Sequence, residues 1–230
     1  MNTITLNGVS SSTIQGLLIQ SLPNIQKPLI RHNIEEIDGV DGDIVTVLGY
    51  SAYDREMLIG LHGSYNVDDV IKFFNSSGTA VFSNEPDKVY QYEILEPIDF
   101  ERLIRWKQAT VTIHVQPFKK KLNEPVITST GTSVSVNNTG NVISKPKIKI
   151  TGSGNIAFYI SNQQIFQIAL GSEGYITIDM EKMEAYKDSV LKNRLVTGNY
   201  ENAFLPVGTS ALRWTGSVTN VEISNYIRYI

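Results

Sequence analysis

The side chains best able to do chemistry are sparse in this chain of 230 residues. It has three histidines and no cysteine, which excludes a cysteine nucleophile and any thiolate-bound metal. His32, His62 and His114 lack the His-x-x-x-His spacing of a metal-binding helix. The segment Gly49–Tyr53 approaches a serine nucleophile elbow but lacks its second glycine. We therefore expect no enzyme activity, no catalytic residue, no bound metal and no cofactor.

Carboxylates gather in one place, Glu35–Asp43, where an oxygen-rich loop could bind calcium. Asp41 and Asp43 match two positions of an EF-hand loop at most. Asp-Gly pairs between two β-like runs are a strong hairpin signal, because glycine accepts a positive φ. A hairpin tip is the favoured interpretation, and an ion site is the alternative.

Glycine-rich and lysine-rich segments are equally weak as binding motifs. Gly152–Gly154 lacks the third glycine of a dinucleotide fingerprint and the Lys-Ser/Thr of a P-loop, so it predicts a turn. Lys119–Lys121 is short and has no ladder of aromatic residues beside it, which favours a solvated linker. The net charge of −3 argues against direct, sequence-specific binding of nucleic acid.

The elements that would position any site are mostly strands. Val, Ile, Thr and Tyr recur in short alternating runs separated by Gly, Ser, Asn and Asp. In the run 109–115, three apolar residues share one face while His114 lies on the other. In the run 89–96, Tyr90 and Tyr92 share a face. This alternation predicts half-buried antiparallel strands.

One helix is predicted over 67–77. Asn66 is a suitable N-cap, two aspartates follow in the first turn, and Gly78 is a C-terminal stop. For the segment 180–190, a second helix and a strand with a hairpin loop are equally good interpretations.

A change of composition near residue 122 predicts two domains, 1–122 and 123–230. The first holds 15 acidic and 11 basic residues (net −4), and the second holds 8 and 9 (net +1). The segment 128–140, just after the boundary, is uncharged and rich in Ser, Thr, Asn and Gly. The predicted fold class is mainly β, with an N-terminal β-sandwich-like domain that carries one helix and a C-terminal β-sandwich.

Aromatic residues are the remaining resource for binding. Strand tyrosines pack in cores, form protein interfaces or stack on sugars. Tyr90, Tyr92 and His114 are the candidates for contacts between subunits. Apolar runs are far shorter than the roughly 20 residues that span a bilayer, so no membrane insertion is expected.

Three segments, in order along the chain, resemble the distal tail protein (Dit) family of siphophages and prophages. The first is the Asp-Gly hairpin at 37–42, which follows the basic and apolar run 30–34. The second extends from the helix at 67–77, through Ser-Asn-Glu-Pro-Asp, to the strand that ends at 115–118 with Val-Gln-Pro-Phe. The third is 205–223, which contains Leu-Pro-Val-Gly and Arg-Trp-Thr-Gly.

The resemblance implies a structural role. Proteins similar to Dit form hexameric rings through the N-terminal domain at the distal end of the tail, between tail tube and baseplate or tip. Their C-terminal domain is a galectin-like or carbohydrate-module-like β-sandwich. The implied partners are copies of the same chain, the major tail tube protein, and tail-tip, tail-associated lysin or baseplate proteins. The implied location is the virion, at the phage tail tip, after assembly in the host cytoplasm.

Two functional hypotheses follow. The leading one is a structural tail hub protein. The alternative is a carbohydrate-binding module that recognises host cell-surface glycans through exposed tyrosines and Trp214. Trp214 beside Gly216 is more simply a core anchor of the last hairpin. Larger relatives carry inserted sugar-binding modules for which 230 residues leave no room, so carbohydrate binding is doubtful.

Overall fold

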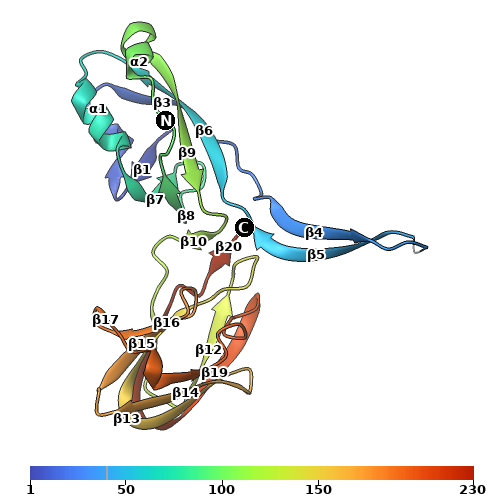
Figure 1. Ribbon diagram of the computed structural model, residues 1–230. Coiled ribbons are helices and arrows are strands. Elements are labelled where there is room, and N and C mark those ends of the chain that lie inside the picture. Colours follow the sequence, from blue (N-terminus) through green and yellow to red (C-terminus); the bar gives the residue numbers. More distant parts are fainter. Residues whose placement is uncertain (40) are drawn as a thin grey trace. The chain divides into compact units, whose positions relative to one another are not determined.

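The computed structural model describes residues 1–39 and 41–230, and these form two compact units (Figure 1). Unit 1 comprises Met1–Leu122 together with Ile230, and unit 2 comprises Asn123–Tyr229. The mainly β class is confirmed, since strands dominate both units. The number of helices was wrong: one was predicted, and the described residues form two α-helices, both in unit 1.

Unit 1 is an antiparallel sheet with two helices and a separate two-stranded hairpin (Figure 1). Its strands follow the order β2-β1-β7-β8-β9-β6-β3, and β10 pairs with β8. In chain order the elements are β1 (Ile4–Leu6), β2 (Val9–Ser10), a 3-10 turn (Ser11–Thr13), β3 (Leu17–Ser21), β4 (Ile30–Glu36), β5 (Asp43–Tyr50), β6 (Tyr53–Leu61), α1 (Val67–Phe74), β7 (Ser77–Phe82), β8 (Lys88–Glu93), α2 (Phe100–Trp106), β9 (Gln108–Val115) and β10 (Lys119–Lys121).

Helix α1 begins as its sequence predicts and ends earlier. The Asn66 side chain accepts a hydrogen bond of 3.0 Å from the amide of Asp68, which satisfies one free donor of the first turn. Phe73 and Phe74 face the core of the sheet. The helix stops at Phe74 because residues 77–82 pair as β7 with β1 and β8, so the sheet takes the backbone that the pattern had assigned to a last helical turn.

Helix α2 was not predicted. Its N-terminus is capped by the Asp99 carboxylate, which accepts from the amide of Arg102 at 2.8 Å. Lys107 closes the other end in a left-handed conformation, and Leu103 enters the core. Seven residues make less than two full turns, which is too short for a helical period to appear in the sequence. None of the described helices is long and apolar enough to cross a membrane.

Unit 2 contains strands only, apart from a short 3-10 turn, in the part of the chain that the structure describes. The segment 180–190 forms strands and a loop, which decides between the two interpretations of its sequence. The elements are β11 (Ile127–Ser129), β12 (Ser133–Asn138), β13 (Lys147–Ile160), β14 (Gln163–Gly171), β15 (Tyr175–Asp179), β16 (Glu184–Lys187), β17 (Val190–Leu191), the 3-10 turn (Asn193–Leu195), β18 (Val196–Gly198), β19 (Gly208–Ser224) and β20 (Arg228–Tyr229).

Two long strands, β13 and β19, form the centre of unit 2. The first part of β13 pairs with β15 and the second part with β14, while β19 runs beside both. The register shifts between Thr151 and Gly152 and again between Ser153 and Ala157. Bulges of this kind bend a strand, and side chains from both parts of β13 enter one core. The sheet therefore folds over itself and encloses that core as a β-sandwich.

Glycines at the bend permit a close approach of β13 and β19. A Cβ on Gly152 would lie 2.2 Å from the carbonyl oxygen of Ser217. A Cβ on Gly216, whose φ is +102°, would lie 2.4 Å from the carbonyl oxygen of Asn155. Any other residue at either position has to push two paired strands apart.

We expect Gly152→Ala and Gly216→Ala each to lower the free energy of unfolding by roughly 2 kcal/mol or more, because each adds a clash with backbone. Urea denaturation, followed by fluorescence of Trp214 in unit 2, measures the effect. Gly131→Ala is the matched control, since its nearest neighbour would be 3.7 Å away. Equal stability of all three variants would contradict this account of the bend.

Candidate functional site

The hairpin formed by β4 and β5, which we call the arm, is the most unusual surface of unit 1. Its strands pair in register from Ile30 opposite Tyr50 to Glu36 opposite Asp43, and they form a sheet of their own (Figure 1). The predicted hairpin is thus confirmed, although Val40 at its tip lies outside the described residues. A two-stranded hairpin alone is at best marginally stable in water.

Apolar side chains cover both faces of the arm. The cross-strand pair of Ile34 and Val45 lies on one face with Val47, and Ile44 lies on the other, while Leu48 is the unpaired residue at a shift of the register. Their exposed fractions, with that of Ile37 near the tip, range from 48% to 62%. Fully burying one Val or Ile side chain is worth roughly 1.5–3 kcal/mol. An exposed apolar patch of this kind is typical of a protein interaction site.

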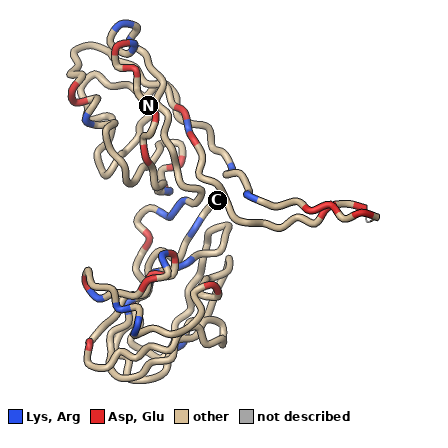
Figure 2. The backbone as a smooth tube through the Cα atoms, viewed as in Figure 1, with Lys and Arg blue, Asp and Glu red and all other residues tan. Residues whose placement is uncertain are grey.

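The tip of the arm is strongly acidic (Figure 2). Five carboxylates lie between residues 35 and 43, and the sequence has no Lys, Arg or His from 33 to 54. Within the described parts of the chain, 1–39 and 41–230, no three His, Asp or Glu side chains come together as a metal-binding group. The arm therefore offers apolar strands and an anionic end.

A buried guanidinium fixes the chain where it leaves the sheet for the arm. Arg55 on β6 is only 2% exposed, and its Nη2 donates to the carbonyl oxygens of Pro23 at 3.2 Å and Asn24 at 3.1 Å. Its Cζ lies 4.5 Å from the ring centre of Phe82 and 4.7 Å from that of Tyr90. Two ring faces and two carbonyls thus compensate for part of the lost hydration of the cation.

Glu85 supplies the negative charge of this cluster. It is buried, accepts from Lys119 Nζ at 2.9 Å and from the phenol of Tyr90, and lies 3.9 Å from Arg55 Nη1. Burial and the hydrogen bond to Glu85 raise the pKa of Tyr90, so the phenol remains a donor. The interpretation of Lys119–Lys121 as a solvated linker was wrong for Lys119, whose ammonium group is enclosed by this cluster.

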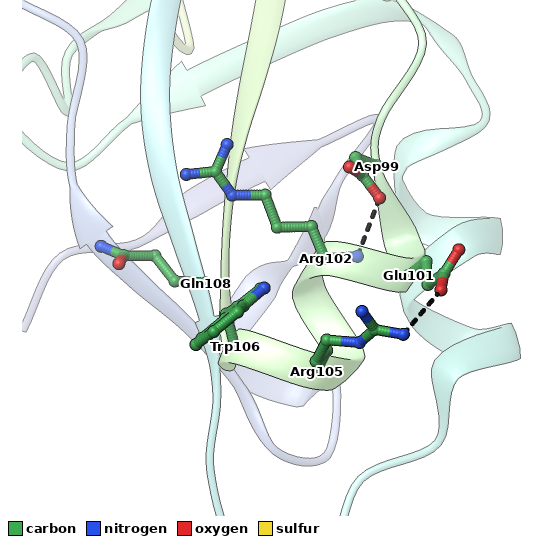
Figure 3. A pocket seen from close by; sticks show the side chains of 6 residues that line it. All are labelled: Asp99, Glu101, Arg102, Arg105, Trp106 and Gln108. Atoms are coloured by element: carbon green, nitrogen blue, oxygen red, sulfur yellow. Dashed lines mark hydrogen bonds and ion pairs between the residues drawn. The ribbon is translucent and has the colours of Figure 1, made fainter.

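A second exposed surface, the α2 face, is formed by Arg102, Trp106 and Gln108. Figure 3 shows the side chains of Arg102 and Trp106 extending to the same side of α2, away from the ion pair of Arg105 with Glu101. Trp106 is 72% exposed, and that ion pair measures 3.2 Å. Trp and Arg are the residue types most enriched among the energetically dominant positions of protein interfaces.

The three residues predicted to make subunit contacts lie neither on the arm nor on the α2 face. Tyr90 and Tyr92 are buried in the core of unit 1, where their side chains offer no surface to a neighbour. His114 is partly exposed on β9, with Nδ1 2.6 Å from the carboxylate of Asp54 on β6. An interface role for His114 stays a prediction. Tyr90 and Tyr92 were chosen because they alternate with polar residues, and such alternation indicates a side chain that faces the core. The arm carries apolar residues on both faces, so its sequence does not alternate in this way.

Trp214 belongs to the core of unit 2, as the simpler interpretation held. Its ring stacks on Phe158 at a centroid distance of 6.4 Å, and its Nε1 donates to the carbonyl oxygen of Gly131 at 3.0 Å. A buried indole cannot stack on a sugar. The carbohydrate hypothesis therefore loses its principal candidate residue.

These two units together define a fold of the Dit class. The crystal structure of the SPP1 Dit protein, described as a paradigm of the hub adsorption apparatus in phages that infect Gram-positive bacteria, is similar over 100% of both chains, with 16% identity and a TM-score of 0.65. The chain therefore has the Dit fold that its three sequence segments predict.

Two structures of the phage P2 baseplate in its activated conformation are also similar. The one with calcium has 8% identity and a TM-score of 0.44, over 100% of this chain and 98% of the other. The one with strontium has 11% identity and a TM-score of 0.48, over 96% of each chain. No protein-family model matches the chain, and no curated protein sequence matches it.

We expect Glu85→Gln to lower the free energy of unfolding by about 3–5 kcal/mol, because it leaves two buried cations without their anion. Tyr90→Phe, which removes only the phenol donor, should cost about 1 kcal/mol. Chemical denaturation followed by circular dichroism measures both. Glu101→Gln is the control, since the exposed carboxylate of Glu101 should change stability little. A Glu85→Gln variant as stable as that control would refute the proposed balance of charge.

Proposed function

We propose that this protein is a structural component of a phage tail hub, and that unit 1 assembles it into a ring of six copies at the distal end of the tail. The Dit fold supports the class of protein. The observation that carries the proposal is the arm, a pair of strands with apolar residues on both faces and no core of its own. Such a ribbon gains stability by lying against another molecule.

The dimensions of the arm suit a contact with a neighbouring copy. Strands of 7 and 8 residues extend about 23–27 Å at the usual rise per residue. Unit 1 without the arm has about 100 residues, and a compact body of that size is about 33 Å across. An arm can therefore reach over most of an adjacent unit 1. A contact in which one surface of a copy binds a different surface of the next is heterologous, and such contacts close into rings when the rotation per copy is suitable.

In this proposal the ring joins the major tail tube protein on one side to baseplate, tail-tip or lysin proteins on the other, within the virion. The protein acts by assembly and not by catalysis. Charged residues make up 19% of the chain, below the usual share of about 25%, which suits a surface that is largely buried against neighbours.

We expect Val45→Ser combined with Val47→Ser to abolish ring formation, because the change removes apolar surface that docking would bury. Sedimentation velocity at high protein concentration and electron microscopy of tails that contain the variant measure assembly, and circular dichroism checks folding. Val190→Ser with Leu191→Ser is the matched control, since these residues form an equally exposed apolar strand in unit 2.

Rings that form as well with the arm variant as with the native chain would show that the arm does not assemble them. A native chain that remains monomeric at high concentration and forms no ring in tails would overturn the hub proposal itself.

A further inference from the structure

The two layers of the sandwich in unit 2 differ in charge. One layer consists of β12, residues 208–215 of β19, residues 154–160 of β13, β14 and β18 (Figure 1), and these strand segments contain a single charged residue, Arg213. The other layer carries paired charges on neighbouring strands, such as Lys147 with Asp179 at 3.4 Å. Charged residues usually make up about 25–35% of a soluble surface. The outer surface of the first layer, which we call the Arg213 face, is therefore unusually poor in charge.

Four side chains form a row across the Arg213 face. Tyr159 on β13 lies opposite Arg213 on one side and opposite Gln164 on the other. Ser133 on β12 lies opposite Arg213 and completes the row. The residue that follows each of these four along its strand packs in the core of unit 2, so the row itself points outward. At the usual spacing of paired strands, the row spans about 14 Å.

The centre of the row is the pair of Arg213 and Tyr159. The Cζ atom of Arg213 lies 4.7 Å from the ring centre of Tyr159. Stacking on a ring restricts the guanidinium and leaves the N–H donors at its edge available. The strands of the Arg213 face carry no acidic residue that could accept from these donors. By contrast, Arg228 of the same unit pairs with Glu181 at 3.4 Å. Arg213 is therefore free to pair with a carboxylate that a ligand supplies.

Hydroxyl and amide side chains surround the central pair. Ser133 and Gln164 flank it within the row, and Nε2 of Gln164 donates to Oε1 of Gln167 at 3.2 Å. The adjacent row has small side chains, with Ala157 opposite Thr215. Hydroxyl and amide groups both donate and accept hydrogen bonds, so they can bind the hydroxyls of a ligand in either direction. The Arg213 face thus offers one cation among neutral polar groups.

This composition distinguishes between classes of ligand. Nucleic acid is bound through several Lys and Arg side chains, and the strands of the Arg213 face have one such residue. A sugar chain is rich in hydroxyls, and an acidic sugar adds a carboxylate that can make two hydrogen bonds to one guanidinium. Residues 123–230 have 9 basic and 8 acidic residues, so their net charge of +1 does not repel such a chain.

We propose that the Arg213 face binds an acidic polysaccharide, with a sugar carboxylate on Arg213 and neighbouring sugar hydroxyls on Ser133 and Gln164. Tyr159 holds the guanidinium in position for this contact. The site does not involve the buried Trp214. It is also independent of ring assembly, since every residue in it belongs to unit 2. Because one ion pair contributes to binding, the affinity falls as the salt concentration rises.

Calorimetric titration of the full chain with oligogalacturonate, a chain of sugar carboxylates, tests the site. We expect saturable binding at low salt. Arg213→Ala should weaken the affinity at least tenfold, because it removes a hydrogen-bonded ion pair. Lys182→Ala is the matched control, since it removes one positive charge from an exposed residue outside the Arg213 face and should bind like the native chain.

An added carboxylate tests the same site in the opposite way. Ser133→Glu places an acid opposite Arg213, where it would pair with the guanidinium and repel the ligand, so we expect at least a tenfold loss of affinity. Ser189→Glu adds the same charge to an exposed residue outside the Arg213 face and should bind like the native chain. Circular dichroism checks that all four variants are folded.

Two further ligands separate acidic sugars from related chemistry. Dextran is a neutral polysaccharide, and poly-L-glutamate has carboxylates without sugar. Each should bind at least tenfold more weakly than oligogalacturonate, and equally tight binding of either would overturn the assignment to an acidic sugar. Absence of binding to oligogalacturonate, or equal affinities of the Arg213→Ala and Lys182→Ala variants, would overturn the site. The hub proposal would survive all of these results, because ring formation is its separate test.

Discussion

Two antiparallel strands bury too little apolar surface to be stable alone, and the arm of this protein consists of two such strands. The rest of unit 1 supplies the stability that the arm lacks. The sheet has a complete core to which both helices contribute, so its strands do not depend on a partner. The arm has no such core, and this difference separates the arm from the rest of unit 1.

The buried cluster of Arg55, Glu85 and Lys119 lies where these two parts meet. Burying two cations and one anion is costly, and an apolar cluster of similar volume often stabilises a protein as well or better. The charged cluster makes hydrogen bonds that an apolar cluster could not make, namely those of Arg55 to the carbonyls of Pro23 and Asn24. They hold the chain in one position just after it leaves β3, on the way to β4. An apolar side chain would fill the same space without fixing that direction.

Unit 2 achieves its stability in a different way. Long strands fold over themselves at glycines, and the two resulting layers enclose Trp214 and Phe158 in one core. Trp214, the residue that made a sugar-binding role most attractive, contributes to that core. The arm of unit 1 differs from these long strands, because its two strands have no second layer to pack against.

The sequence by itself determined the features that depend only on residues close together along the chain. It predicted the alternating strands, the Asn66 cap of α1 and the hairpin at the Asp-Gly pairs, because local backbone preference and period decide these features. Only the tertiary structure decided which apolar or charged groups are covered. Tyr90 and Tyr92 proved to be buried, Lys119 found a buried partner more than thirty residues away, and Val45 and Val47 stayed in water. Burial depends on which strands pair across long separations, and that information is not carried by any single segment of the chain.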